Sequence, residues 1–234
     1  MNVHPVKTRV FEEGEDLAAF IAWHVPELKD GSILAVTSKI VALAEGRTAD
    51  AKDKEKIIRA ESDWAIETKQ VWLTEKDGML LANAGVDASN ADGKLILLPK
   101  DSFKVAIALR RELQKHFKLK KLGILITDSR VMPLRTGVVG VALGHSGFRG
   151  LRDYRGKKDI FGRALKFTQT NIADSLATSA TLAMGEGGER QPLCIIEGAP
   201  VEFCEKINRK ELKITLKDDM FYPLFKTVLR RRRK

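Results

Sequence analysis

Residues 122–129 of the chain have the sequence LGILITDS. Their apolar run is typical of a strand buried inside a sheet, and it ends in two polar residues, Asp128 and Ser129. Open α/β folds place ligands at the carboxyl ends of such strands. The stretch therefore predicts a buried strand and a candidate site at its end.

Apolar runs of a similar kind predict further strands at residues 1–10, 32–38, 79–85, 94–99, 137–144 and 192–198. Helical periodicity predicts helices within 14–25 and at 39–46. A third helix is expected after Asp101, with an apolar stripe at residues 105, 109, 113 and 117. A fourth is expected at 168–184, where a glycine-rich stretch stops it. Strands and helices do not alternate regularly along the chain. We therefore expect an α+β fold with mixed β-sheets and packed helices.

The composition is that of an ordinary globular protein, with 44% hydrophobic residues in a chain of 234. No run reaches the ~18 apolar residues that a membrane-spanning helix needs. Two cysteines, Cys194 and Cys204, are too few for a disulfide framework. These features lead us to expect a cytoplasmic protein with no membrane segment and no export signal.

The formal charge of +10 suggests anionic partners, but half of it comes from the last five residues, 230–234. We expect one α+β unit over 1–225 and a basic tail over 226–234. Such a tail can bind nucleic acid or an acidic surface, although a charged chain end is more often a solvated, disordered segment.

Three polar clusters stand at the ends of apolar runs: Asp87 with Asn90, Asp128 with Ser129, and Glu186. Their oxygen ligands are those that a hard cation such as Mg²⁺ or Mn²⁺ accepts, usually together with substrate phosphates. The alternative for each cluster is purely structural. Asp87 and Ser89 would then make Asx and Ser turns, Asp128 would cap the next element, and the glycines near Glu186 would stop a helix.

Phosphate-binding candidates are the glycines 185, 187 and 188 and the helix start at 37–39, because both offer backbone N–H groups to an anion. No Walker or dinucleotide-binding motif is present. A basic segment could hold an acidic substrate, or could stack bases through its interleaved aromatic residues; it comprises Arg135, Arg149, Arg152, Arg155, Lys157, Lys158 and Arg163.

Several of these stretches together resemble the coenzyme F420 γ-glutamyl ligase family. They are NAGVDASN at 83–90, GILITDS at 123–129, RTGVVGVALGHSG at 135–147, KDIFGRALKFTQTNIAD at 158–174 and MGEGGERQP at 184–192. The likeness extends to EGEDLAAFI at 13–21 and SILAVTSKIVALAEGR at 32–47.

The resemblance implies a GTP-dependent ligase that uses Mg²⁺ or Mn²⁺ to join L-glutamate to a carboxylate of a deazaflavin precursor through an acyl phosphate. It also implies the γ-glutamyl ligase-like fold and an intertwined homodimer. Carried over residue by residue, it assigns Asp87 and Asp128 to one metal and to catalysis, and Ser129 and Glu186 to a second metal. The nucleotide would be bound by Ser38, Lys39, Asn90, Gly185, Gly187, Gly188 and Glu189.

Two departures from the family pattern leave alternatives open. Leu43 stands where the family has a nucleotide-contacting lysine, so that either Lys39 takes its place or triphosphate binding is weaker. The segment SRVMPLR at 129–135 also differs from the common family version, so the acceptor could instead be a folate. An RNA- or DNA-binding protein remains the alternative of another class, and steep loss of affinity with salt would distinguish it.

Overall fold

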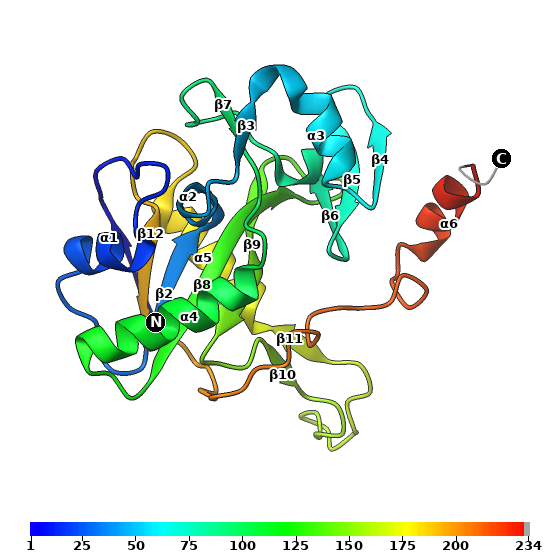
Figure 1. The fold of residues 1–234 in the computed structure, drawn as a ribbon. Helices are drawn as coiled ribbons and strands as arrows, with labels where there is room; N and C mark the ends of the chain where they lie inside the picture. Colours follow the sequence, from blue (N-terminus) through cyan, green and yellow to red (C-terminus); the bar gives the residue numbers. More distant parts are fainter. Residues whose placement is uncertain (232–234) are drawn as a thin grey trace.

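A five-stranded mixed sheet forms the centre of the molecule (Figure 1). The computed structural model describes residues 1–231. The strand order is β1, β12, β2, β8, β9, with bounds Asn2–Val6, Leu193–Glu197, Ser32–Thr37, Leu122–Val131 and Val138–Ser146. β2 and β8 run parallel, whereas the other neighbours in this sheet are antiparallel. The expected α+β class with mixed sheets is confirmed.

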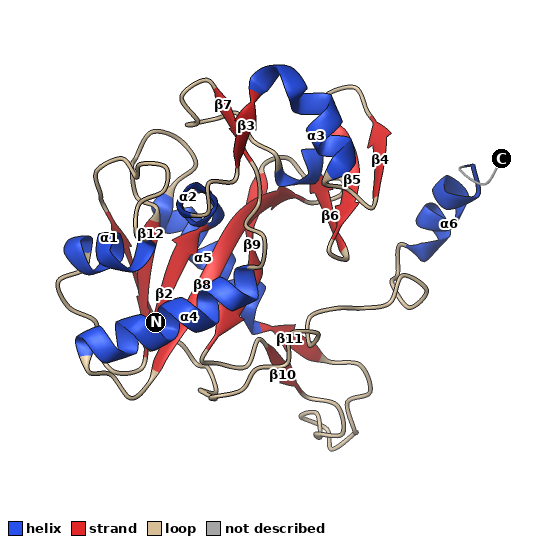
Figure 2. Cartoon of the chain, viewed as in Figure 1, coloured by secondary structure: helices blue, strands red, loops and turns tan. Residues whose placement is uncertain are grey.

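Helices cover both faces of this sheet (Figure 2). Side chains of a strand alternate between its two faces, and in β2 Leu34 and Val36 enter one core while Ile33 and Ala35 enter the other. The first core is completed by α1 (Leu17–His24), α2 (Ser38–Ala44) and α4 (Ser102–Phe117), and the second by α5 (Ile172–Met184). β2 and β8 are therefore apolar on both sides, as their continuous hydrophobic runs predicted.

Two aspartates start the helices on the first face. The side chain of Asp16 accepts from the Ala19 backbone N–H at 2.8 Å, and that of Asp101 accepts from the Lys104 N–H at 3.0 Å. Each bond satisfies an N–H group that the first helical turn leaves unpaired. The expected stripe of α4 is confirmed, since Leu109 and Leu113 are buried in the first core and the side chains at 105 and 117 pack against it.

The helix predicted at 168–184 begins four residues later, at Ile172. Residues Gln169–Asn171 form β11 instead, paired with β10 (Leu151–Asp153). Asn171 accounts for the difference, because its side chain accepts from the Asp174 backbone N–H at 2.9 Å and so caps the helix. The glycine-rich stop after Met184 is confirmed, since Gly185 is the C-cap with φ of +80°.

The strand containing Asp128 continues past it. β8 pairs with β9 as far as Val131, with Asp128 opposite Val141 and Ser129 opposite Gly140. The expectation that the strand ends at these polar residues is wrong, as is the alternative that Asp128 caps the following element. The register shifts between Ile126 and Thr127, at the end of the buried part of the strand. Beyond this irregularity the side chains become partly exposed, which permits polar residues.

Residues 48–96 form a smaller layer beside the main sheet. It contains two small sheets, with a core of Ile58, Val86, Leu95 and Leu97. The predicted strands at 1–10, 79–85 and 94–99 are shorter than expected and end at Val6, Ala82 and Ile96. The elements are β3 (Thr48–Asp50), η1 (Ala51–Asp53), α3 (Lys54–Ala60), β4 (Trp64–Glu67), β5 (Trp72–Lys76), β6 (Met79–Ala82), η2 (Asn83–Gly85) and β7 (Lys94–Ile96).

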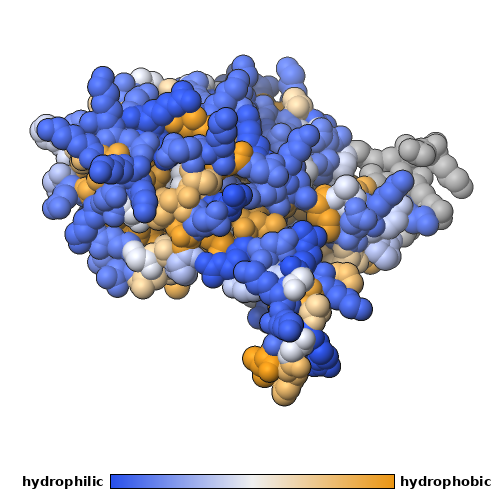
Figure 3. Space-filling view, turned by 90° about the horizontal axis from the view of Figure 1, so that it is seen from below, coloured by the Kyte–Doolittle hydropathy of each residue, from blue (hydrophilic) through white to orange (hydrophobic). Residues whose placement is uncertain are grey.

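Two segments extend from this body. β10 and β11 are the base of an arm, residues 151–171, that carries the exposed Ile160, Phe161 and Phe167. Figure 3 views the molecule from below and shows hydrophobic residues along this face and at the end of the projecting lobe. The C-terminal segment leads to α6 (Tyr222–Arg231), which stands away from the body (Figure 1).

The proposed boundary between residues 225 and 226 falls within α6. The last part of the expected basic tail, 232–234, lies outside the described residues. Within residues 1–231, no helix combines the length and the apolar character needed to cross a membrane.

Candidate functional site

The parallel pairing of β2 and β8 brings Ser38 and Asp128 together. Thr37 and Thr127 are register partners at the ends of the buried parts of the two strands, so the next residues lie side by side. Ser38 opens α2, and its hydroxyl donates to Asp128 Oδ1 at 3.1 Å. Residues 90 positions apart thus meet at one edge of the main sheet.

The loop 83–90 places Asp87 at the same edge. Asp87 Oδ1 accepts from the Ser89 backbone N–H at 2.7 Å, and Oδ2 accepts from the Ser89 hydroxyl at 2.9 Å. The backbone of Asp87 exchanges two hydrogen bonds with Ile96, which anchors the loop on β7. The Asx turn is therefore present, and it fixes a carboxylate in a defined position rather than merely reversing the chain.

Lys39 connects α2 to this loop. Its ammonium lies 2.8 Å from Asp87 Oδ2, and it donates to the Ser89 hydroxyl at 2.7 Å and to the Ser89 carbonyl at 3.0 Å. The Asp87 side chain is 44% exposed and that of Lys39 is 28% exposed, so water still reaches the pair. The first two residues of α2 thus each contact one of the two predicted metal carboxylates.

Gly85 allows the loop to turn tightly. Its φ is +73°, and a Cβ at this position would lie 2.4 Å from the Leu98 side chain. Ala84 and Asn90 also have positive φ, a conformation that costs free energy in residues other than glycine. The loop holds this backbone because its hydrogen bonds to β7 and its packing against Leu98 determine its path.

The loop after α5 completes the candidate site. Asn90 Nδ2 donates to the Gly187 carbonyl at 3.2 Å, and the Ser129 hydroxyl donates to Glu186 Oε2 at 3.2 Å. The loop is also closed on itself, since Glu189 Oε2 accepts from the Gly187 N–H at 2.8 Å. Hydrogen bonds and ion pairs thus link all three polar clusters expected from the sequence. Of the predicted residues, Gly188 has open space where a Cβ would lie.

The two aspartates have opposite pKa shifts. Burial raises the pKa of Asp128 to about 6, and the negative charge of Asp87 contributes to this rise. Burial also acts to raise the pKa of Asp87, but the hydrogen bond and charge of Lys39 outweigh it and leave that pKa below its ordinary value. Asp87 is therefore ionised at neutral pH, whereas the hydrogen bonds of Ser129 and Ser38 and the charge of Lys39 offset only part of the effect of burial on the pKa of Asp128.

The oxygen atoms at this edge suit a hard divalent cation. Among residues 1–231, no three Asp, Glu, His or Cys side chains approach closely enough to form a metal site by themselves. Mg²⁺ is usually bound by only one or two carboxylates, with water and substrate phosphates as its other ligands. Asp87 and Asp128, with the hydroxyls of Ser38 and Ser129, fit such an incomplete site.

Leu43 packs against the hydrophobic interior. It is partly buried against Ala42, Ala91 and Ile96 and against the first core of the main sheet. An apolar contact thus fills the position where the resemblance led us to expect a nucleotide-contacting lysine. Lys39, one helical turn earlier, is the cation that contacts the loop at Asp87.

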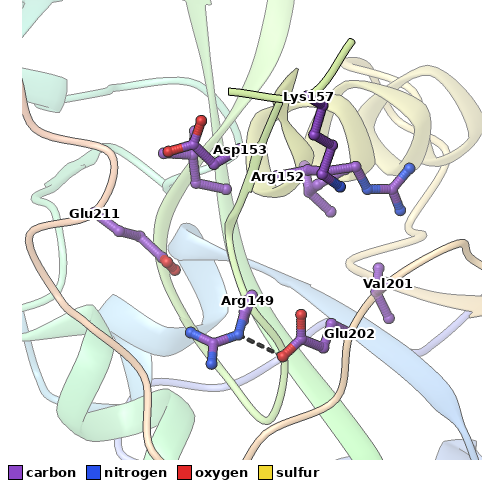
Figure 4. Close-up of a pocket in the computed structure, with 9 residues that line it drawn as sticks. Arg149, Arg152, Asp153, Lys157, Val201, Glu202 and Glu211 are labelled. Carbon is purple, nitrogen blue, oxygen red and sulfur yellow. Dashed lines mark hydrogen bonds and ion pairs between the residues drawn. The ribbon is translucent and has the colours of Figure 1, made fainter. Parts of the chain in front are cut away.

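A cavity of about 540 Å³ lies away from this edge, at the amino end of α5 (Figure 4). It contains part of the basic segment that the sequence singled out, together with acidic residues of the C-terminal segment. Its lining comprises Arg149, Leu151, Arg152, Asp153, Lys157, Ile172, Val201, Glu202 and Glu211. Arg149 Nε lies 2.6 Å from Glu202 Oε1, so this cation is already paired.

His145 lies beneath one wall of this cavity and is fully buried. Glu211 Oε1 accepts from the Gly150 N–H at 2.6 Å and lies 3.3 Å from His145 Nε2. Burial lowers the pKa of His145 to about 4 and outweighs a backbone hydrogen bond with Phe148, which acts to raise it. The imidazole is therefore neutral at physiological pH.

Sequence reasoning missed two parts of this arrangement. Ser89 was expected only as a turn residue, although its hydroxyl joins Lys39 to Asp87; the Asp-x-Ser spacing was the available signal. The acidic wall of the cavity, Glu202 and Glu211, comes from a segment without a motif. Its position depends on contacts such as Arg110 with Glu205, at 2.7 Å, which no local pattern encodes.

Comparison with known proteins identifies, over most of the chain, the family that the sequence motifs resemble. The family model described as F420-0:Gamma-glutamyl ligase matches residues 5–198. A protein named "Coenzyme F420:L-glutamate ligase" from Methanopyrus kandleri is 38% identical over 225 residues, covering 86% of this chain and 88% of the relative. Proteins of the same name from Archaeoglobus fulgidus and Methanocaldococcus jannaschii are 35% and 36% identical, covering 86% and 83% of this chain and 89% and 86% of theirs. The chain belongs to the F420-0:gamma-glutamyl ligase family.

Proposed function

We propose that this protein joins L-glutamate to a carboxylate of the F420-0 deazaflavin precursor, with GTP and Mg²⁺ or Mn²⁺. The observation that carries the proposal is the gathering of Asp87, Asp128 and Glu186 at one edge of the sheet in a chain of this family. A carboxylate does not react with an amine at neutral pH, because its leaving group would be oxide. An activation step that consumes GTP removes this barrier.

The reaction has two steps. An oxygen of the acceptor carboxylate attacks the γ-phosphorus of GTP, the bond from that phosphorus to the β,γ-bridging oxygen breaks, and GDP leaves. The glutamate amine then attacks the carbonyl carbon of the acyl phosphate, phosphate leaves with the bonding electron pair, and the nitrogen loses a proton. Both steps collect negative charge, so catalysis depends mainly on positioning and electrostatic stabilisation.

We assign Asp87 and Asp128 to one divalent cation and Ser129 and Glu186 to a second. When bound, these ions would neutralise the phosphate oxygens and hold the reactants in line. Ser38 would keep the Asp128 carboxylate oriented through its hydroxyl. Lys39, Asn90, Gly185, Gly187, Gly188 and Glu189 would form the nucleotide side of the site.

The charge pattern gives less support to nucleic-acid binding. Several arginines of the basic segment are engaged by acidic neighbours: Arg149 with Glu202, Arg155 with Asp153, and Arg163 with Asp159. A groove that follows a nucleic-acid backbone needs cations free to contact phosphates. The acidic partners of these arginines would first have to be displaced.

We also propose that the protein is a homodimer. Large apolar side chains are exposed on segments that extend from the body, which is unfavourable for an isolated chain. They include Ile160, Phe161 and Phe167 on the arm and Ile214, Met220 and Leu224 in the C-terminal segment. A second copy that covers these side chains would explain why the segments extend away from the core. Sedimentation of the purified protein as a monomer at micromolar concentration would contradict this part of the proposal.

The test of the activity is direct. The purified protein would be incubated with GTP, Mn²⁺ and L-glutamate, with the deazaflavin precursor in one reaction and a folate in another. We expect the deazaflavin acceptor to gain one or more glutamyl mass increments, with one GDP released per increment. If only the folate were glutamylated, the proposed reaction would stand and its acceptor would be a folate instead. Absence of both product and GDP would refute the proposal.

A further inference from the structure

Two charged side chains of the candidate site occupy contacts that we assign to ligands. The clearest case is Asp87, whose Oδ2 lies 2.8 Å from the Lys39 ammonium. The same ammonium donates to the hydroxyl and carbonyl oxygens of Ser89. One internal cation is thus surrounded by three oxygens of the loop 83–90, including the carboxylate that we assign to a divalent cation.

The loop after α5 shows the reverse arrangement, in which an internal anion rather than an internal cation makes the contacts. Gly185 bends the loop with a φ of +80°. The Gly187 N–H donates to Glu189 Oε2 at 2.8 Å. A Cβ on Gly185 would lie 2.5 Å from the Glu189 carboxyl carbon, so this carboxylate lies directly within the bend of the loop. Backbone N–H groups in glycine loops of this kind bind phosphate oxygens in other proteins. Here an internal anion occupies that position.

We propose that Lys39 and Glu189 are internal counter-ions, which occupy the positions of a divalent cation on Asp87 and of a nucleotide phosphate on Gly187, and which leave when those ligands bind. This inference rests on the proposed function, since it uses the metal and nucleotide of that reaction. It adds one step to that function, in which each ligand exchanges with a charged side chain of the protein. Each ligand has to displace a charge of the protein before it reaches its own contacts.

The exchange has a thermodynamic consequence. A metal ion that displaces Lys39 releases an ammonium next to the nucleotide side of the site, where it can contact a phosphate oxygen. A phosphate that displaces Glu189 likewise releases a carboxylate near Glu186 and the metal side. Each ligand therefore increases the affinity for the other, and such coupling is reciprocal.

The first test measures Mn²⁺ binding to the whole protein by electron paramagnetic resonance, without nucleotide. We expect Lys39→Gln to tighten Mn²⁺ binding about threefold to tenfold, because the competing cation of a partly exposed ion pair is gone. Lys39→Arg keeps the charge and should retain wild-type affinity. Lys94→Gln is the matched control, since Lys94 also pairs with a carboxylate, Glu13, at 2.6 Å, but makes no ion pair with Asp87.

The second test measures GDP binding by calorimetry in the presence of a chelator. Glu189→Gln keeps an acceptor for the Gly187 N–H but removes the charge, and we expect it to tighten GDP binding about threefold to tenfold. In contrast, Lys39→Gln should weaken GDP binding in the presence of Mn²⁺. A residue with a purely structural role would not move the two affinities in opposite directions.

The outcomes separate this inference from the proposed function. If the wild type binds Mn²⁺ and loses it on Asp87→Asn, but Lys39→Gln leaves the affinity unchanged or weaker, the exchange is refuted and the metal assignment stands. If neither the wild type nor Lys39→Gln binds Mn²⁺, both the metal assignment and the exchange are refuted. Unchanged or weaker GDP binding by Glu189→Gln would refute the anionic half of the exchange.

Discussion

The two ends of α5 differ in the charges that they face, and the difference is not the one that the helix dipole favours. The amino end, capped by Asn171, opens on the cavity with Arg152 and Lys157, and it is the end that favours anions. The carboxyl end leads into the loop that we assign to phosphates, next to Asp128 and Glu186. Anion binding at the carboxyl end must therefore depend on loop N–H groups and bound cations rather than on the helix dipole.

The two ends also differ in how their charges are arranged. At the carboxyl end, residues from three distant parts of the chain converge, and each part carries a polar residue beside an apolar run. At the amino end, the cations are held by neighbours a few residues away or by the C-terminal segment. A site assembled from distant segments is sensitive to single carboxylates, whereas a cavity with paired surface charges is not.

The strongest test of this difference exchanges one carboxylate at each end. Asp128→Asn should lower glutamylation at least about 100-fold, because a neutral amide cannot balance the charge of the divalent cation. Far-ultraviolet circular dichroism should show that the fold is kept. Asp153→Asn, at the cavity, should retain activity within about twofold. Equal activities of Asp128→Asn and wild type at saturating metal would remove Asp128 from the site.

The pH dependence of stability should have opposite signs in the two regions. The pKa of Asp128 is raised to about 6, so without metal its contribution is lost as pH rises from 4 to 6. The pKa of His145 is lowered to about 4, so its contribution is lost as pH falls from 6.5 to 4. Each effect amounts to about 2 kcal/mol over this range, and they largely cancel.

Single variants separate the two contributions. In urea denaturation between pH 4 and 6.5, Asp128→Asn should become more stable with rising pH, because only the His145 contribution remains. His145→Gln should become less stable over the same range. Parallel pH curves for the two variants would show that these residues do not titrate as inferred.

Backbone substitutions should separate stability from binding at the two ends. Asn171→Ala removes a helix cap and should lower the free energy of unfolding by about 1 kcal/mol, with little change in nucleotide affinity. Gly185→Ala places a Cβ against the Glu189 carboxylate at a φ of +80° and should cost about 1–3 kcal/mol. It should also weaken GDP binding. Unchanged GDP affinity for Gly185→Ala would mean that this loop does not contact the nucleotide.

The smallest effect is expected for Lys157→Gln. Lys157 lies at the amino end of α5, and 13 helical residues separate the ends by about 18 Å. Nucleotide affinity measured by calorimetry should change by less than about twofold, since exposed charges are strongly screened beyond ~10 Å at 0.1 M salt. A clear loss would indicate that the arm of a second copy reaches this site.

Local patterns predicted much of the fold but little of how the site is assembled. The continuous apolar runs of β2 and β8 and the start of α4 after Asp101 are encoded within a few residues, and the structure confirms them. The start of α5 and the extension of β8 were predicted wrongly. The extension of β8 depends on its pairing with β9, and the start of α5 depends on the Asn171 cap together with the pairing of Gln169–Asn171 with β10. A single sequence reveals neither pairing.

The site residues could be predicted from the sequence by their chemical type, whereas the contacts between them could not. Asp87, Asp128 and Glu186 are visible as carboxylates beside apolar runs, and the family pattern groups them. The hydrogen bond from Ser38 to Asp128 follows only from the parallel register of β2 and β8. The pairing of Lys39 with Asp87 needs the path of the loop 83–90, which depends on β7 and Leu98.

The parallel pair β2 and β8 has a further consequence, for folding kinetics. Its partners are 90 residues apart, as in Thr37 with Thr127, and closing so long a loop is a slow, entropically costly event. A partly folded chain that lacks this pair has no Ser38–Asp128 contact. A metal or nucleotide would then bind only after the central sheet is complete, so these ligands should slow unfolding without accelerating the search for the fold.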